Sequence, residues 1–204
     1  MMSSTPMTMN DVESLIHQSL RSLRDTSLDS DNDRYLCNDL RKVVCFDEVK
    51  RLYANSRGYS EDKLASVDAV FQSQGKRFFV EFKSKVSKCE KFKVKRKASD
   101  SILIYLDLFG ISLGEFCRGS EFILVTLEED PKTKEDIEGY ERFADSIMAL
   151  SDAKELVGFT MLSLKGIHFS DVHTYTVEKF NEFLDRHKDI AEISVPKVPQ
   201  DFSE

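Results

Sequence analysis

The sequence of 204 residues predicts a single α/β domain in which helices flank a sheet. Several segments place apolar residues three and four positions apart, which is the spacing of an amphipathic helix. Two neighbouring segments alternate apolar and polar residues around a glycine turn, which is typical of a β-hairpin. The nearly continuous apolar run over residues 121–127 indicates a strand that is covered on both faces.

The N-terminal third is expected to be helical. A first helix is predicted over residues 10–23, where Asn10 and Glu13 are spaced like a capping box. Its apolar stripe consists of Val12, Leu15, Ile16, Leu20 and Leu23. The acidic, polar residues 25–33 indicate a loop, and residues 35–53 are predicted to begin as a second helix. The pattern over residues 43–46 fits a helix or a strand.

The hairpin is predicted from residues 64–71 and 77–83. The turn between them, residues 72–76, contains Gly75. Asp68 lies in the first strand, and Glu81 and Lys83 lie in the second. Because residues two apart on a strand project to the same face, Glu81 and Lys83 point together, and antiparallel pairing can bring Asp68 close to them.

The C-terminal part is expected to alternate helices and strands. A helix over residues 99–109 ends at Gly110, a typical C-cap residue, and the buried strand over residues 121–127 follows. Further helices are predicted over residues 137–150 and 177–187, with one or two strands between residues 156 and 176. Residues 195–204 indicate a tail.

Composition is that of an ordinary globular protein, with 41% apolar and 32% charged residues. No apolar run approaches the roughly 20 residues that cross a bilayer. The first ten residues lack the basic and apolar regions of a secretory signal, so a cytoplasmic protein without membrane contact is expected. The four cysteines are widely spaced and are expected to be reduced.

Charge is distributed unevenly along the chain. The net charge is -7, yet residues 83–97 hold eight basic residues and one acid. Such a segment would attract a polyanion to one place on an acidic protein. The alternative is a solvated, lysine-rich surface. The expected nucleic-acid contacts are Lys85, Lys88, Lys91, Lys93, Lys95, Arg96 and Lys97.

Asp68, Glu81 and Lys83 are the candidate catalytic residues. Two carboxylates beside apolar strands repel each other and lose hydration, and a divalent cation removes that conflict. Mg²⁺ suits one or two carboxylates, a backbone carbonyl and several waters. A nearby ammonium can orient a water or offset charge that develops on phosphorus. The alternative is a charged outer face of the hairpin with no chemical role.

The stretch VDAVFQSQGKRFFVEFKSK resembles the hairpin of the PD-(D/E)XK nuclease superfamily. The resemblance covers about residues 35–127 and implies a restriction-endonuclease-like αβββαβ core with the acids on its second and third strands. Around that core we expect a mixed sheet flanked by helices, with extra α/β elements over residues 137–190. Val67 stands where the family name has proline.

The resemblance implies a Mg²⁺ or Mn²⁺ ion on Asp68, Glu81 and the carbonyl of Phe82, with Lys83 serving the attacking water. Many members add an acid from the preceding helix, for which Glu48 is the candidate and Glu13 the second choice. The implied activity is hydrolysis of phosphodiester bonds, with DNA favoured over RNA. The alternative is an inactive module of the same fold that binds nucleic acid or a protein partner, or forms a homodimer.

Overall fold

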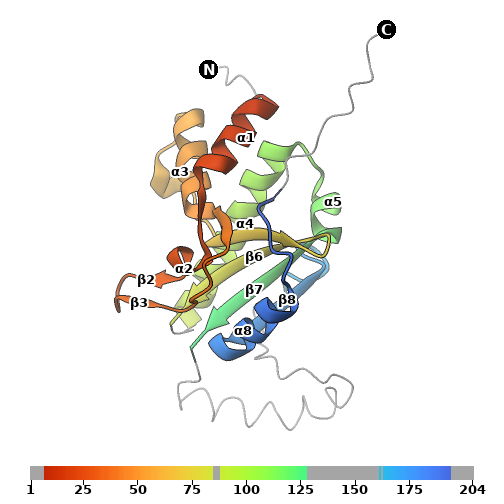
Figure 1. Ribbon diagram of the computed structural model, residues 1–204. Coiled ribbons are helices and arrows are strands. Elements are labelled where there is room, and N and C mark those ends of the chain that lie inside the picture. Colours follow the sequence, from red (N-terminus) through yellow and green to blue (C-terminus); the bar gives the residue numbers. More distant parts are fainter. Residues whose placement is uncertain (1–6, 85–87, 128–160, 162, 194–204) are drawn as a thin grey trace.

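A six-stranded mixed sheet forms the centre of the protein in a computed structural model (Figure 1). The structure describes residues 7–84, 88–127, 161 and 163–193. In spatial order the strands are β1 (Leu20–Ser22), β4 (Lys42–Cys45), β5 (Ala69–Ser73), β6 (Lys76–Lys83), β7 (Ser120–Thr126) and β8 (Asp171–Thr176). The first four pair antiparallel, and β6, β7 and β8 run parallel. A mixed sheet is therefore confirmed.

Helices cover both faces of this sheet. One face carries α1 (Met9–Gln18), α3 (Phe46–Arg57), α4 (Lys88–Phe109) and α5 (Leu113–Arg118). The other face carries the short α2 (Leu23–Thr26) and α8 (Val177–Arg186), which lies below the sheet in Figure 1. A 3-10 turn, Glu61–Lys63, and the small ribbon of β2 (Leu28–Asp29) and β3 (Arg34–Tyr35) lie outside these layers.

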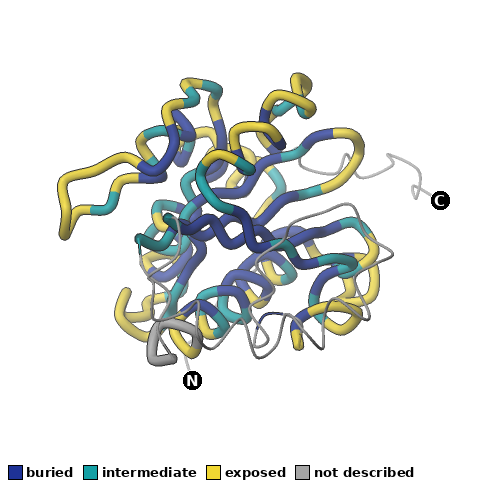
Figure 2. Tube along the Cα trace, turned by 90° about the horizontal axis from the view of Figure 1, so that it is seen from below, coloured by how far each residue is buried: buried dark blue, intermediate teal, exposed yellow. Residues whose placement is uncertain are grey.

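Each face has its own apolar core. Phe79 of β6 is completely buried against Phe46, Tyr105 and Phe116 on the α4 face. The next residue along, Val80, belongs to the core on the α8 face. Figure 2 shows buried residues running through the central strands, with exposed residues on the outer helix turns and loops. The sheet is covered on both sides, as its apolar strands require.

The predicted hairpin is confirmed as β5 and β6. Gln74 and Gly75 have φ values of 50° and 74°, as both central residues of a two-residue type I′ turn must. Ala69 pairs with Val80 and Phe71 with Phe78, which fixes the register. Strand β7 and helix α8 also form where they were predicted.

The first predicted helix, over residues 10–23, is wrong in its second half. Helix α1 starts at a capping box between Thr8 and Asp11 and ends at Gln18. The chain then pairs as β1 with β4, where Leu20 lies opposite Val44. The apolar spacing continues through both elements, so periodicity alone could not place the boundary.

A helix beginning near residue 35 is also wrong. Residues 34–35 form β3, and residues 42–45 form β4, so the ambiguous segment over 43–46 is mainly a strand. Helix α3 starts only at Phe46 and ends at Arg57, and Gly58 follows with a φ of 67°, which suits a left-handed cap. Pairing of Val44 with both Leu20 and Val70 explains why this segment is extended.

Helix α4 is longer than predicted, because it begins at Lys88 and not at residue 99, and it ends at Gly110 with a φ of 62°. Of the expected strands between residues 156 and 176, β8 is present. The helix predicted over residues 137–150 and the tail over 195–204 lie outside the described residues. In the part of the chain that the structure describes, no helix has the length and apolar character needed to cross a membrane.

Candidate metal centre

Asp68 and Glu81 meet at the start of β5 on the α4 face of the sheet. Asp68 lies directly before β5, where its backbone N–H donates to the carbonyl of Val80 over 3.1 Å. Its carboxylate accepts the backbone N–H of Phe82 over 2.6 Å. Glu81 projects from β6 on the opposite face from Val80 and Phe82. The hairpin register therefore brings the two acids together.

Lys97 of α4 joins these carboxylates. Its ammonium nitrogen lies 3.1 Å from Oδ1 of Asp68 and 3.0 Å from Oε2 of Glu81, and both contacts are hydrogen bonds. A third contact of 2.8 Å to Oε1 of Glu81 is an ion pair without hydrogen-bond geometry. One cation thus bridges both acids.

Lys83 lies at the rim of the same cluster. Its ammonium nitrogen is 3.4 Å from Oε1 of Glu81, as expected for residues two apart on one strand. The side chain is 23% exposed, whereas that of Glu81 is fully buried and that of Asp68 is 15% exposed. The predicted residues Asp68, Glu81 and Lys83 therefore lie together, with Lys83 towards the solvent side.

Burial and mutual repulsion change the proton affinities in this cluster. Burial, reinforced by the charge of Asp68, raises the pKa of Glu81 to about 8. Burial also raises the pKa of Asp68. Burial alone would lower the pKa of Lys97, but the charges of Asp68 and Glu81 outweigh it and raise that pKa. The carboxylate pair lacks enough positive charge to compensate its burial fully.

Helix α3 supplies a further acid near the cluster. Asp47 in its first turn accepts a hydrogen bond from the hydroxyl of Ser66 over 2.5 Å. The negative charge of Asp47 contributes to the raised pKa values of Asp68 and Lys97. Asp47 is therefore close enough to act on the site electrostatically.

Glu48, the candidate fourth ligand, is engaged elsewhere. Its carboxylate lies 2.6 Å from a guanidinium nitrogen of Arg51 and 3.9 Å from one of Arg21. The hydrogen bond from Arg51 lowers the pKa of Glu48. The second choice, Glu13, lines a surface hollow together with Ile193. Sequence reasoning selected Glu48 and missed Asp47, although both lie in the first turn of α3.

Side chains of α4 hold the segment that leads into Asp68. Ser101 accepts the backbone N–H of Val67 over 2.9 Å, and Asp100 accepts that of Ala65 over 2.9 Å. Arg96 lies 3.4 Å from Asp100 and donates to the carbonyl of Lys63 over 3.0 Å. The same helix that provides Lys97 thus also fixes the position of Asp68.

The basic side chains over residues 83–97 lie in different environments. Lys93 and Arg96 are exposed and Lys95 is half-buried, whereas Lys97 points into the carboxylate cluster. Lys88 and Lys91 lie at the start of α4, and Lys85 lies outside the described residues. Lys97 shares an inward face with Val94, Ala98 and Ser101, whose helical spacing is the sequence signal that could have separated it from the surface lysines.

The available donors fit a hard divalent cation that takes only a few of its ligands from the protein. Within the described residues, no group of three or more His, Cys, Asp or Glu side chains is arranged to hold a metal ion. Asp68 and Glu81 offer two carboxylates, and Phe82, 7% exposed, lies between Glu81 and Lys83 on the strand. Mg²⁺ is commonly held by one or two carboxylates with waters completing its shell, which this pair could supply. Burial disfavours the ionised form of Glu81, and a bound cation would stabilise that form.

Comparison of the chain with protein-family models, with curated proteins and with solved structures found no match.

Proposed function

We propose that this protein is a metal-dependent nuclease of the PD-(D/E)XK type that hydrolyses phosphodiester bonds, with DNA favoured over RNA. The observation that carries the proposal is the convergence of Asp68, Glu81 and Lys83 at one partly buried position. Two neighbouring buried carboxylates whose pKa values are both raised are a common mark of a functional centre.

The order of elements around the site supports this proposal. Strands β4, β5 and β6 are antiparallel neighbours, and α4 then crosses to β7, which is parallel to β6. This agrees with the βββαβ part of an αβββαβ core, in which Asp68 opens the second strand and Glu81 lies on the third. Helix α3 stands between the first and second strands, and α1 precedes the first, so the core would carry an insertion.

In the proposed reaction, Asp68 and Glu81 would hold a Mg²⁺ or Mn²⁺ ion together with the carbonyl of Phe82. The ion supplies Lewis acidity towards a phosphate oxygen and lowers the pKa of water. Lys83 orients the attacking water or offsets charge on phosphorus. Asp47 is a better-placed fourth acid than Glu48, because its charge acts on Asp68 and Lys97 and its ion pair with Lys50, at 3.4 Å, is longer than the 2.6 Å pair of Glu48 with Arg51.

Lys97 has two roles in this proposal. With the metal absent, its ammonium neutralises both carboxylates over 2.8–3.1 Å. With a metal bound, the ion would repel the ammonium of Lys97, which would then be available to a substrate phosphate. The exposed Lys93 and Arg96 and the half-buried Lys95 on the same helix then contact the nucleic-acid backbone.

The same lysine favours the alternative of an inactive, nuclease-like module that binds nucleic acid or a protein. The ammonium of Lys97 already compensates part of the charge of Asp68 and Glu81 without any metal. In that alternative Lys97 keeps its place permanently, and the basic part of α4 serves binding alone.

Cleavage assays test the proposal. Purified protein is incubated with plasmid DNA, single-stranded DNA and RNA in Mg²⁺, in Mn²⁺ and in EDTA. We expect metal-dependent cleavage that Asp68→Asn and Lys83→Met lower at least about a hundredfold, the size of effect for a positioned catalytic group. Asp185→Asn and Lys188→Met, exposed on and after α8, are the matched controls and should retain full activity. Cleavage that persists in EDTA, or that both site variants retain, contradicts the proposal, and absence of cleavage on all three substrates favours the inactive module.

A further inference from the structure

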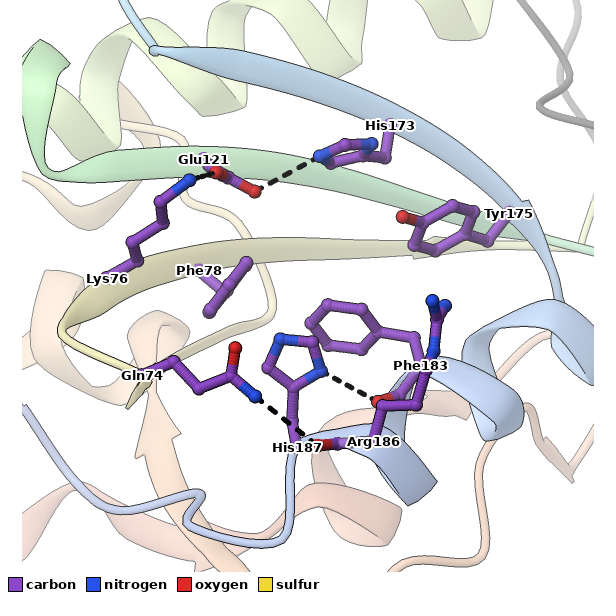
Figure 3. Close-up of a pocket in the computed structure, with 9 residues that line it drawn as sticks. All are labelled: Gln74, Lys76, Phe78, Glu121, His173, Tyr175, Phe183, Arg186 and His187. Atoms are coloured by element: carbon purple, nitrogen blue, oxygen red, sulfur yellow. Dashed lines mark hydrogen bonds and ion pairs between the residues drawn. The ribbon is translucent and has the colours of Figure 1, made fainter. Parts of the chain in front are cut away.

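A polar cavity lies on the α8 face of the sheet, opposite to the face that carries Glu81. Its volume is about 240 Å³, and it opens beside the turn between β5 and β6 (Figure 3). Strands β6, β7 and β8 contribute Lys76, Glu121 and His173 near their first residues, whereas Glu81 lies near the end of β6. The cavity is therefore separate from the Asp68–Glu81 cluster in both face and position along the strands.

Glu121 organises one end of this cavity. Its side chain is 9% exposed, bonds the ammonium of Lys76, and lies 3.1 Å from Nε2 of His173. Although burial opposes ionisation, the bonds from His173 and Lys76 lower the pKa of Glu121 to about 2. Glu121 is thus an ionised, fixed acceptor, and Lys76 and His173 are held beside it as polar groups of defined position.

Aromatic rings form the wall next to this polar end. The rings of Phe183 and His187 are stacked with centroids 3.9 Å apart, and Phe78 meets both edge-on at 5.1 and 5.4 Å. Nδ1 of His187 donates to the carbonyl of Phe183 over 2.8 Å, which leaves Nε2 directed towards the cavity in Figure 3. Phe78 and Phe183 are buried, and Phe183 is also stacked on Phe180, so the half-buried ring of His187 is the part of this wall that a ligand can reach.

Arg186 provides a cation on the side of the cavity away from Lys76 (Figure 3). Its Nε donates weakly to the carbonyl of Glu182 over 3.4 Å, and among the described residues no acid pairs with its guanidinium. The amide of Gln74 donates to the carbonyl of Arg186 over 3.3 Å, which ties the end of α8 to the hairpin turn. An unpaired guanidinium can bind a phosphate or carboxylate through two parallel hydrogen bonds.

We propose that this cavity binds a single nucleotide unit, with its phosphoryl group at Arg186 and its base against the ring of His187. Aromatic side chains stack on bases of any identity, and the base edge, which carries donors and acceptors, faces Lys76 and Glu121. The volume lies below the roughly 300–1,000 Å³ that is usual for pockets of drug-sized ligands, which limits the ligand to a single nucleotide. The unit is a free nucleoside monophosphate or the phosphorylated end of a strand.

Calorimetric titrations in EDTA test this site independently of any metal at Asp68 and Glu81. Adenosine and uridine 5′-monophosphates should bind saturably, whereas inorganic phosphate and the matching nucleosides should each bind at least about tenfold more weakly, equivalent to about 1.4 kcal/mol. Oligonucleotides with and without a 5′-phosphate distinguish a strand end from a free nucleotide. A clear preference for the phosphorylated strand would identify the strand end as the natural ligand.

Variants separate the pocket from the rest of the surface. Arg186→Gln and His187→Ala should each weaken binding of the monophosphates about tenfold or more. Lys188→Gln removes an exposed charge two residues away and should bind like the unchanged protein. Asp68→Asn should also leave this binding unchanged, so loss of nuclease activity and loss of nucleotide binding are distinguishable. Absence of saturable binding, equal affinity for phosphate alone, or unchanged affinity in both pocket variants would overturn the proposal.

Discussion

The ammonium of Lys97 lies 2.8 Å from the carboxylate of Glu81, a side chain with no solvent exposure. Because the same nitrogen also contacts Asp68, removal of this cation leaves two buried carboxylates facing each other. Above pH 8, where Glu81 is ionised, we expect Lys97→Met to lower the free energy of unfolding by about 3 kcal/mol without metal. Urea denaturation measures this loss, and Lys95→Met on the same helix is the control.

A double variant tests whether this loss comes from the carboxylate pair. Lys97→Met combined with Glu81→Gln removes the cation and one of the two charges, and should recover much of the stability lost by Lys97→Met alone. Mn²⁺ should also stabilise Lys97→Met more than the unchanged protein, because it replaces the missing cation. Equal losses in the single and double variants would show that Lys97 acts by packing alone.

The raised pKa of Glu81 predicts a stability that falls with increasing pH. The folded protein keeps a proton up to about pH 8, whereas the unfolded chain releases it near the ordinary value of 4.5. Between these values the folded state binds more protons, so the free energy of unfolding decreases as pH rises, by at most about 1.4 kcal/mol per pH unit. Urea denaturation in EDTA at several pH values checks this slope, which Glu81→Gln should reduce and the exposed Glu182→Gln should preserve. An unchanged slope in Glu81→Gln would contradict the assignment.

The lowered pKa of Glu121 predicts that the free energy of unfolding decreases as the pH falls into the acid range. Its pKa is lowered from 4.5 to about 2 despite burial, because His173 and Lys76 bind the ionised form. The stabilisation is complete above about pH 4.5 and is lost as pH falls towards 2. Glu121→Gln should therefore cost about 2 kcal/mol at pH 7 and less at pH 3. Thermal unfolding at both pH values provides the measurement, and an equal loss at both would exclude an electrostatic origin.

Substitutions of Phe79 test the packing of the core that supports the candidate metal centre. Its fully buried ring contacts Phe46 of α3, Tyr105 of α4 and Phe116 of α5. Phe79→Ala should lower the free energy of unfolding by about 3–5 kcal/mol, whereas Phe79→Leu should cost less because it leaves a smaller cavity. Chemical denaturation of both variants measures this difference. A cost below about 1 kcal/mol for Phe79→Ala would contradict the described packing.

Much of the central fold was predictable because its signals are local. Alternation and the turn at Gly75 predicted the hairpin, and the apolar run predicted β7. The end of α1 was predicted wrongly and the segment of β4 was left open between helix and strand, because Leu20 and Val44 are strand residues through their pairing with each other. Such pairing joins distant parts of the chain, which periodicity does not report.

The candidate site was predictable in part for the same reason. Asp68, Glu81 and Lys83 follow from the hairpin register. Lys97 was grouped with the surface lysines by its charge, although its helical position places it beside Val94 and Ala98 on the buried face of α4. The choice between Asp47 and Glu48 depends on how the first turn of α3 meets Ser66, which is a tertiary contact.

Calorimetric titration of Mn²⁺ tests the central claim, that Asp68 and Glu81 form a divalent-cation site. The unchanged protein should show one saturable site, which Asp68→Asn and Glu81→Gln abolish. Asp47→Asn should weaken it, and Glu48→Gln should leave it intact, since Glu48 is paired with Arg51. Absence of saturable Mn²⁺ binding, or the same affinity in Asp68→Asn and Glu81→Gln as in the unchanged protein, would contradict this account.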